Sequence, residues 1–144
     1  MAEPRQQFKD TLKKHGHSLT RARLAVFHAL QDKEPQTMAE VVKACAGQAD
    51  RASVYRTISL FEATGVARRL RIGWKYKLEL SDTFNHHHHH LTCLDCGAVT
   101  PLPEDKLLEE RLRLLAGRSR FRMKDHQLEI QGLCADCRES PVKS

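Results

Sequence analysis

Long hydrophobic runs are missing from this sequence, and aromatic residues are few. None of its apolar stretches approaches the roughly 18 residues that a membrane span requires, and residues 1–5 (MAEPR) do not begin the apolar core of a secretory signal peptide. We therefore expect a cytoplasmic protein with no membrane partner. The 144 residues are 40% apolar and 29% charged, which excludes wholesale disorder and fits one domain or two very small ones.

Acidic residues are fewer than basic ones, and the whole difference lies in the first half of the chain. The net charge is +6; residues 1–84 contain 15 Lys+Arg and 9 Asp+Glu, whereas residues 85–144 contain nine of each. Because the whole excess lies in the first half, we expect that half to meet a polyanion. Four of the five cysteines and six of the nine histidines lie in the second half, so the chain is bipartite.

The first half is patterned as short helices followed by a hairpin. Thr20, Thr37 and Asp50 are suitable helix caps, and each precedes a segment with apolar side chains on one face. Alternating apolar and charged residues over 69–80, interrupted by Gly73-Trp74, predict a β-hairpin with a tight turn. Three or four helices and a basic hairpin predict a winged helix-turn-helix over residues 1–80.

The second half predicts an α/β domain that is too small to be stable alone. Residues 81–85 are short, polar and unpatterned, as expected of a hinge. Beyond them, residues 86–144 predict short strands, two of them at 121–123 and 126–130, around one helix that opens near Asp105 and ends at Gly117. About 60 residues of this kind are only marginally stable, so we expect a metal site and a dimer partner. The predicted fold class is α+β.

Four cysteines form two Cys-x2-Cys pairs. Two thiolates at this spacing can bind one tetrahedral ion, and two such pairs complete an all-sulfur structural zinc site. Disulfides or a redox dithiol are the alternatives, but a cytoplasmic chain disfavours disulfides and a redox centre needs only one pair. The fifth cysteine, Cys45, lies on an apolar helix face, where we expect it to be buried. The predicted zinc ligands are Cys93, Cys96, Cys134 and Cys137.

Five consecutive histidines occupy residues 86–90, directly before the first cysteine pair. In a strand, alternate residues face opposite sides, so one run could serve two metal sites. Glu79, Glu109 and His126 are candidate completing ligands. The alternative interpretation is a solvated polar tract.

Together these motifs resemble the ferric uptake regulator family of bacterial metal-responsive repressors. The most specific part is HHHHHLTCLDCG at residues 86–97, supported by SVYRT at 53–57, YKLEL at 76–80 and HQLEI at 126–130. The resemblance implies a homodimer with an N-terminal winged-helix domain and a C-terminal dimerisation domain. It also implies repression of metal-uptake genes when the sensed metal is bound.

The resemblance also assigns two further metal sites. A regulatory site between the domains corresponds to Glu79, His88 and His90; the histidine that usually joins them is replaced by Gln36. The fourth ligand is therefore open among Gln36, Glu34, His86 and water. A second site, within the dimerisation domain, corresponds to His87, His89, Glu109 and His126.

Departures from the family pattern bear on the sensed metal. The family often has aspartate where His89 stands, and the added imidazole suits zinc and other borderline ions. Pro101 occupies the position of an acidic ligand in the peroxide sensors, which disfavours peroxide sensing. Zinc sensors commonly have a cysteine near the position of Glu79, and this chain has none there. The sensed metal is predicted to be Zn(II) or Fe(II).

The helix that Asp50 caps and Gly65 stops is the predicted recognition helix for double-stranded DNA. With Val54, Ile58 and Phe61 facing inward, the polar and basic side chains between them face outward. Arg69, Arg71 and the hairpin lysines are expected to contact phosphates. His17 stands where the family usually has a minor-groove lysine. The predicted DNA-binding residues are Arg51, Ser53, Tyr55, Arg56, Lys75 and Lys77.

Two other classes of function compete with a repressor. Clustered histidine and glutamate could hold a catalytic zinc ion, but no His-Glu-x-x-His motif is present and the basic half would be unexplained. A metal-storage protein or metallochaperone would use the histidines but would not need a recognition helix. We therefore predict a metal-dependent DNA-binding repressor that is not an enzyme.

Overall fold

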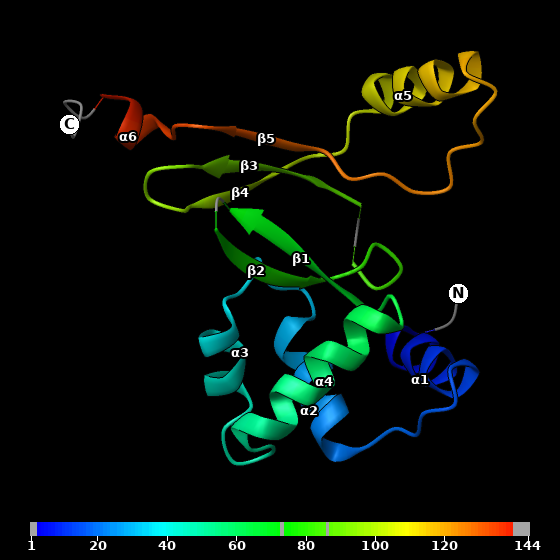
Figure 1. Ribbon diagram of the computed structural model, residues 1–144, viewed down its shortest axis with the longest axis vertical. Helices are drawn as coiled ribbons and strands as arrows, with labels where there is room; N and C mark the ends of the chain where they lie inside the picture. Colours follow the sequence, from blue (N-terminus) through cyan, green and yellow to red (C-terminus); the bar gives the residue numbers. More distant parts are fainter. Residues whose placement is uncertain (1–2, 73, 86, 140–144) are drawn as a thin grey trace. The chain divides into compact units, whose positions relative to one another are not determined.

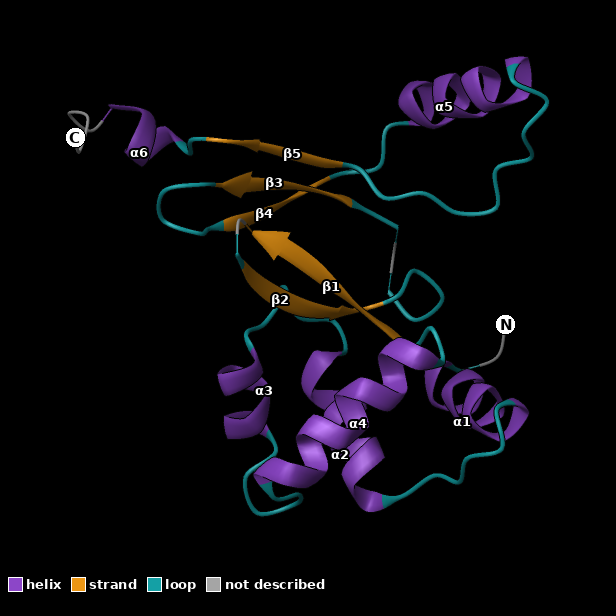
Figure 2. Cartoon of the chain, viewed as in Figure 1, coloured by secondary structure: helices purple, strands orange, loops and turns teal. Residues whose placement is uncertain are grey.

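The chain divides into two structural units, residues 1–86 and 87–144. The computed structural model describes residues 3–72, 74–85 and 87–139. No helix within these residues is long and apolar enough to cross a lipid bilayer. The first unit contains four helices and a hairpin (Figures 1 and 2): α1 (Pro4–Lys14), α2 (Arg21–Leu30), α3 (Met38–Ala44), α4 (Arg51–Ala63), β1 (Ala67–Ile72) and β2 (Lys75–Leu80).

Side-chain caps begin three of these helices, as the sequence predicts. The Thr20 hydroxyl accepts the Arg23 N–H at 3.2 Å, and the Asp50 carboxylate accepts the Ser53 N–H at 2.7 Å. α3 has a full capping box between Thr37 and its third residue, Glu40. Each cap satisfies N–H groups that have no partner inside the helix, and so fixes where the helix starts.

The core of the first unit is aromatic. The rings of Phe8 and Phe27 stack with centroids 4.2 Å apart, and Phe61 meets Phe8 edge-on at 5.3 Å. These rings join α1, α2 and α4, and Cys45 is buried in the same cluster, as predicted. Offset and edge-on packing of aromatic rings adds to their hydrophobic burial. The three helices are thus held around one core.

The hairpin forms the wing of a winged helix-turn-helix. Its strands pair antiparallel in one register, with Arg71 opposite Tyr76 and Ile72 opposite Lys75. Gln36, just before α3, pairs with Leu78 through two backbone hydrogen bonds of 2.9 and 2.6 Å. The helix-turn-helix is therefore joined to the wing by backbone pairing as well as by side-chain packing.

The segment predicted as a hinge, residues 81–85, is attached to the first unit. The Ser81 N–H donates to the Val66 carbonyl at 2.9 Å. Phe84 is buried, and its ring meets Phe27 edge-on at 5.5 Å. The sequence pattern does not reveal this attachment, because one phenylalanine in a polar stretch has no periodicity. Residue 86 lies outside the described residues, and the hinge role stays a prediction.

The second unit is a three-stranded sheet with a long helix. Its elements are β3 (His89–Cys93), β4 (Val99–Leu102), α5 (Lys106–Arg118), β5 (Glu129–Gly132) and α6 (Ala135–Glu139). The strand order is β4-β3-β5; β4 pairs antiparallel and β5 parallel with the central strand. The predicted α+β class, a winged helix followed by a small α/β domain, is confirmed.

Several predicted boundaries in the second unit are wrong. Residues 121–123 form no strand: the Phe121 N–H donates to the Ala116 carbonyl at 3.0 Å and Arg120 has a φ of +55°, so this segment closes the end of α5. α5 also continues past the predicted stop at Gly117, to Arg118. Two further elements, β4 and the short α6, have no clear signal in the sequence. Pro101 disfavours strands, but it is tolerated in β4 because that strand lies at the edge of the sheet.

Candidate metal centres and nucleic-acid interface

The four predicted zinc cysteines converge in the second unit. Their sulfur atoms all lie within 4.8 Å of one another, and the Sγ atoms of Cys96 and Cys134 are 3.8 Å apart. Four sulfurs bonded to one tetrahedral zinc ion would be about 3.8 Å apart, since each Zn–S bond is about 2.3 Å long. The donor set therefore fits zinc in both chemistry and spacing. Cys93 is the last residue of β3 and Cys96 follows that strand, whereas Cys134 directly precedes α6 and Cys137 lies in it. An ion held by all four therefore joins both ends of the unit.

Backbone donors prepare this cluster for a cation. N–H groups of Cys134 and Cys96 point at the Cys93 sulfur and lower the pKa of its thiol to about 6. The thiolate is the form that binds zinc. Hydrogen bonding to the Cys134 thiol shifts the pKa of Cys137 in the opposite direction, above its usual range. Four close sulfurs cannot all ionise without a cation, so the arrangement favours an ion at its centre. Gly97, in the left-handed region at φ +75°, closes the first turn.

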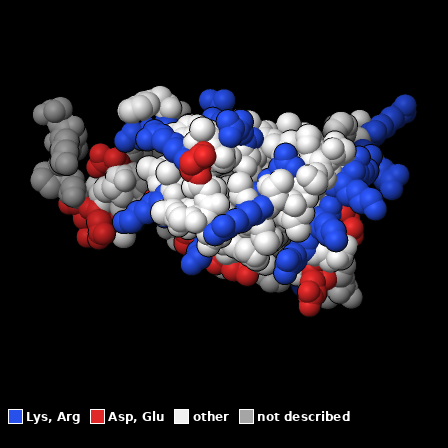
Figure 3. Space-filling view, turned by 90° about the horizontal axis from the view of Figure 1, so that it is seen from below, with Lys and Arg blue, Asp and Glu red and all other residues white. Residues whose placement is uncertain are grey.

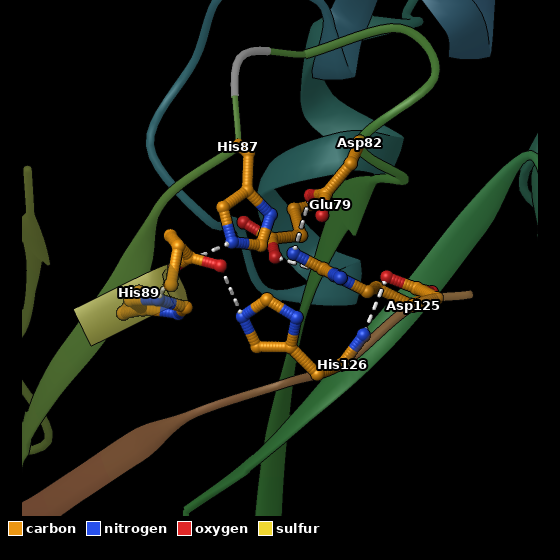
Figure 4. A network of polar contacts seen from close by, with 8 residues as sticks. Glu79, Asp82, His87, His89, Asp125 and His126 are labelled. Atoms are coloured by element: carbon orange, nitrogen blue, oxygen red, sulfur yellow. Dashed lines mark hydrogen bonds and ion pairs between the residues drawn. The ribbon is translucent and has the colours of Figure 1, made fainter. Parts of the chain in front are cut away.

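A second cluster places three imidazoles around one carboxylate. Nε2 of His89 lies 2.6 Å from a carboxylate oxygen of Glu109, Nε2 of His126 lies 2.9 Å from the other oxygen, and Nε2 of His87 lies 3.3 Å away. Figure 4 shows the rings of His87 and His126 directed at a shared carboxylate, with His89 beside it. The ligand atoms of the four residues lie within 4.8 Å of one another. The structure thus brings together the whole predicted second site.

Three elements build this cluster. His89 is on β3, Glu109 is in the first turns of α5, and His126 precedes β5. Glu109 is 4% exposed. Its burial alone would raise the pKa of the carboxyl, but the hydrogen bond with His89 and the charges of His126 and His87 outweigh it, so the pKa lies below its usual value. Three nitrogens and a carboxylate oxygen are a ligand set that zinc and other borderline divalent ions accept.

The remaining two described histidines of the run face another way. The rings of His88 and His90 lie together, with centroids 4.6 Å apart, as those of His87 and His89 do at 4.8 Å. The predicted alternation along the run is therefore present. His90 is buried and His88 half-buried. These two histidines belong to the second unit and Glu79 to the first, and their assignment to one regulatory site stays a prediction.

Glu79 belongs to an ion-pair network that the sequence pattern does not reveal. Arg68, opposite it on β1, donates from Nε to the Glu79 carboxylate at 2.8 Å and from a terminal nitrogen to Asp82 at 2.9 Å. Glu79 is 1% exposed, and a buried carboxylate needs such a partner. The sequence shows that Arg68 and Glu79 have opposite charges, but only the register of β1 and β2 shows that they are opposite one another. Gln36, a candidate fourth ligand, donates its side-chain amide to the Ala29 carbonyl at 2.5 Å.

The predicted recognition helix presents its polar face outward. Val54, Ile58 and Phe61 are buried, as predicted, while Tyr55 and Arg56 are exposed. Lysine and arginine predominate over carboxylates on the face in Figure 3. Neighbouring outward side chains order one another: Arg51 donates to the Tyr55 hydroxyl at 3.3 Å, and Arg56 donates to the Ser53 hydroxyl at 3.2 Å.

A cavity of about 360 Å3 opens between α2 and α4. Its lining includes the guanidinium-bearing Arg23 and Arg56 and the hydroxyl-bearing Thr20 and Ser53. Two cations and two hydroxyl groups around a hollow suit a phosphate. His17, at the position of the usual minor-groove lysine, is half-buried in the loop that precedes α2. The cavity therefore adds Arg23 to the candidate DNA contacts.

The wing cations differ in how they are paired. Arg69 forms two hydrogen bonds with the Glu62 carboxylate, one of them at 3.0 Å, and its guanidinium lies over the Tyr76 ring. Arg71, Lys75 and Lys77 have no carboxylate partner among the described residues. Of the four predicted phosphate contacts on the hairpin, Arg69 is therefore already engaged within the protein.

Comparison with known proteins identifies what this arrangement resembles. The ferric uptake regulator family matches residues 14–131. A ferric uptake regulation protein from Vibrio anguillarum is 34% identical over 98% of this chain and 95% of its own length. The solved structure of the ferric uptake regulator from Pseudomonas aeruginosa with manganese has a TM-score of 0.75 at 27% identity, covering 88% of this chain and 96% of that one. The regulator from Francisella tularensis with iron has a TM-score of 0.66 at 25% identity, covering 86% and 96%.

Proposed function

The chain belongs to the ferric uptake regulator family of metal-responsive transcriptional regulators, and on that premise we propose that it is a metal-dependent repressor of metal-homeostasis genes. Family membership confirms the prediction that it is not an enzyme, because members of this family regulate transcription. The proposed repressor binds operator sites in double-stranded DNA as a homodimer in the cytoplasm. It senses Zn(II) or Fe(II).

The observation that carries the proposal is the outward face of α4. Arg51, Tyr55 and Arg56 lie on the exposed side of a helix whose other side is buried in a helix-turn-helix core. A helix presented in this way can enter the major groove, where arginine reads guanine and an aromatic ring contacts the thymine methyl group. Ser53, Lys75 and Lys77 complete the proposed contacts, mainly to phosphates. A storage protein or metallochaperone has no use for such a face.

Exposed apolar side chains on the second unit support the homodimer. Of the described residues of α5, Glu109 alone is buried, whereas Leu107 is 78% exposed and Leu114 and Leu115 are also exposed. Ile130 and Leu133, in and just after β5, are exposed too. Apolar surface of this extent, in a unit with little core of its own, marks an interaction site. A second copy of the chain is the proposed cover.

Two of the proposed metal sites lie wholly within the second unit. Cys93, Cys96, Cys134 and Cys137 would hold a structural Zn(II), which supplies folding energy to a unit with few buried side chains. His87, His89, Glu109 and His126 would hold the second ion. The three imidazole nitrogens favour Zn(II) or Fe(II) over harder ions such as Mn(II).

The proposed regulatory site joins the two units. Glu79 lies near the end of β2, and His88 and His90 follow the segment that leaves the first unit. A bound zinc ion holds its ligand atoms at fixed distances of about 2.0–2.2 Å for nitrogen and oxygen. If these three side chains share one ion, the angle between the units becomes fixed. In a homodimer that angle sets the separation of the two α4 helices, which must match half-sites about one helical turn apart.

A DNA-binding titration tests the proposal. Protein is purified without added metal and its metal content is measured. Duplexes are then selected from a random pool by the Zn(II)-loaded and the Fe(II)-loaded protein. Binding of a selected duplex is followed by fluorescence anisotropy with and without each ion, at several salt concentrations. The proposal expects binding that requires metal and weakens steeply with salt.

The Arg56→Ala variant is the matched control for this titration. It should keep the metal content and oligomeric state of the wild type and lose most of its DNA affinity. Wild-type protein that binds metal but selects no duplex would overturn the repressor assignment and favour storage or metal transfer. If the wild-type protein binds the selected duplex equally tightly with and without metal, the sensing role alone would be overturned.

A further inference from the structure

Trp74 is the single tryptophan of the chain, and it lies at the tip of the wing. It directly precedes β2 and is 89% exposed, the most exposed large apolar side chain in the described part of the chain. Single exposed apolar residues are common on protein surfaces. An indole is more unusual, because its large apolar ring gains much from burial and its N–H is a hydrogen-bond donor.

The charges around Trp74 indicate what could cover it. At the base of the wing, Arg68 is paired with Glu79 and Asp82, and Arg69 with Glu62. Toward the tip, no described carboxylate pairs with Arg71, Lys75 or Lys77. The positive charges of the wing are therefore neutralised by carboxylates at its base and are not neutralised at its tip.

The lysine next to the indole is positioned with it. The Lys75 ammonium lies 5.1 Å from the centre of the Trp74 ring, within cation–π distance. This contact keeps a positive charge and an aromatic face together at one point. An apolar protein surface would have to desolvate three unpaired cations around the indole, whereas a polyanion supplies their counter-charges.

We propose that the Trp74 indole packs on the sugar–phosphate backbone of duplex DNA, beside the base pairs contacted by α4. The ring would lie on the apolar face of a deoxyribose, and its N–H would donate to a phosphate oxygen, with Lys75 on an adjacent phosphate. Contacts to sugar and phosphate carry no direct sequence information, so Trp74 adds affinity and positions the wing. The inference rests on the proposed DNA-binding function.

Because the chain has one tryptophan, emission excited at a wavelength that tyrosine does not absorb reports on the wing tip alone. Metal-loaded protein is titrated with unlabelled duplex of roughly 30 base pairs, about three helical turns, while binding of the same labelled duplex is followed in parallel by anisotropy. A selected duplex and a random-sequence duplex at low salt are compared. Both should change the Trp74 emission as anisotropy rises, and both should protect it from a soluble quencher.

Two substitutions separate a packing contact from a charge contact. Trp74→Ala should weaken binding of both duplexes by roughly five-fold and leave the salt slope unchanged, because no charge is removed. Lys75→Ala should lower the salt slope by about one. The side chain of Trp74 is exposed, so the variant should fold and melt like the wild type, and Trp74→Phe should recover part of the affinity.

The outcomes distinguish the inference from the proposed function. DNA binding without any change in Trp74 emission, or with full affinity in Trp74→Ala, overturns the wing contact and leaves the repressor assignment in place. If the Trp74 emission changes when the protein is diluted without DNA, the indole lies in a contact between protein copies. That result also overturns the proposed contact with DNA. Failure of metal-loaded wild type to bind either duplex overturns the proposed function, and the wing contact with it.

Discussion

Nε2 of His89 and a carboxylate oxygen of Glu109 lie 2.6 Å apart, and both side chains are almost fully buried. This contact joins β3 to α5 at the one buried position of the helix in the described residues. A helix is usually attached to a sheet by an apolar face, but every leucine of α5 is exposed or half-buried. The attachment of α5 therefore depends on a polar cluster that can exchange protons for a metal ion.

Glu109→Gln should destabilise the protein and remove the ion of the second site. The amide keeps the shape but loses the charge that three imidazoles face, and breaking a buried polar network of this kind costs about 2 kcal/mol or more. Thermal unfolding and metal content are the measurements. Glu110→Gln, at the adjacent exposed position, is the control and should change neither. Equal unfolding temperatures and metal contents for the two variants would contradict the cluster's role.

The same carboxylate should make the metal-free protein sensitive to acid. The pKa of Glu109 is lower in the folded protein than its usual value. Its contribution to stability is therefore fully present above the unfolded pKa, about 4.3, and is lost as pH falls through the lower folded value. The difference in unfolding temperature between wild type and Glu109→Gln should narrow as pH falls below about 4. A difference that widens over this range would show that the sign is wrong.

Cys96→Ser should lower the zinc content and disrupt the dimer. One ligand of four is lost, and zinc bound at such a site can be worth roughly 10 kcal/mol or more to folding. Metal analysis and sedimentation measure the two effects. Cys45→Ala removes a buried cysteine outside the cluster and should keep the zinc, although it lowers stability. A Cys96→Ser protein that is dimeric, with unchanged zinc and melting temperature, would exclude the structural site.

The first unit could be predicted closely because its signals are local. Caps at Thr20, Thr37 and Asp50 act within one turn of a helix, and hairpin alternation acts between neighbouring residues. The end of α5 was misplaced because a backbone hydrogen bond from Phe121 to Ala116 closes it, and no side-chain type signals that bond. Phe84 illustrates the same limit, since its burial depends on Phe8 and Phe27, far away in the sequence.

The candidate metal sites could be predicted in part. The Cys-x2-Cys spacing predicts the four-cysteine site, and strand geometry predicts that alternate histidines of the run face opposite sides. The two ligand sets that these histidines join came from the family resemblance. The network of Arg68, Glu79 and Asp82 could not be predicted, because it requires the cross-strand register of β1 and β2. The positive charge at the wing tip likewise could not be predicted, because the sequence does not show that Arg68 pairs with Glu79 and Arg69 with Glu62.

Arg56→Ala should weaken DNA binding without changing metal content or dimerisation. Its guanidinium is exposed on α4, lines the cavity with Arg23, and donates a hydrogen bond to the Ser53 hydroxyl. Tyr55→Ala should reduce discrimination between a selected and a random duplex by roughly 1–3 kcal/mol if Tyr55 contacts a base. Anisotropy titrations measure both effects. Arg122→Ala removes an equal charge from an exposed position in the second unit; if it weakens binding as much as Arg56→Ala does, the effect is not specific to α4.

The proposed regulatory site couples two equilibria, metal binding and DNA binding. If Glu79, His88 and His90 share one ion, His88→Ala should abolish metal-dependent DNA binding while sparing the four-cysteine zinc and the dimer. Glu79→Gln should do the same. Arg68→Ala breaks the ion pair of Glu79 but keeps the proposed ligand, so it should retain a metal response and separates loss of a ligand from loss of local structure. His87→Ala should act on the second site instead, since His87 lies with His126 and Glu109.

Linkage makes this prediction quantitative. If metal tightens DNA binding by some factor, DNA must tighten metal binding by the same factor, commonly about 5- to 150-fold. Metal titrations with and without a saturating selected duplex measure one factor, and DNA titrations with and without metal measure the other. The wild type should give equal factors, and both should fall to about one in His88→Ala. If His88→Ala keeps the coupling and His87→Ala or His126→Ala removes it, the regulatory ion is bound within the second unit, and the angle between the units is not what the metal controls.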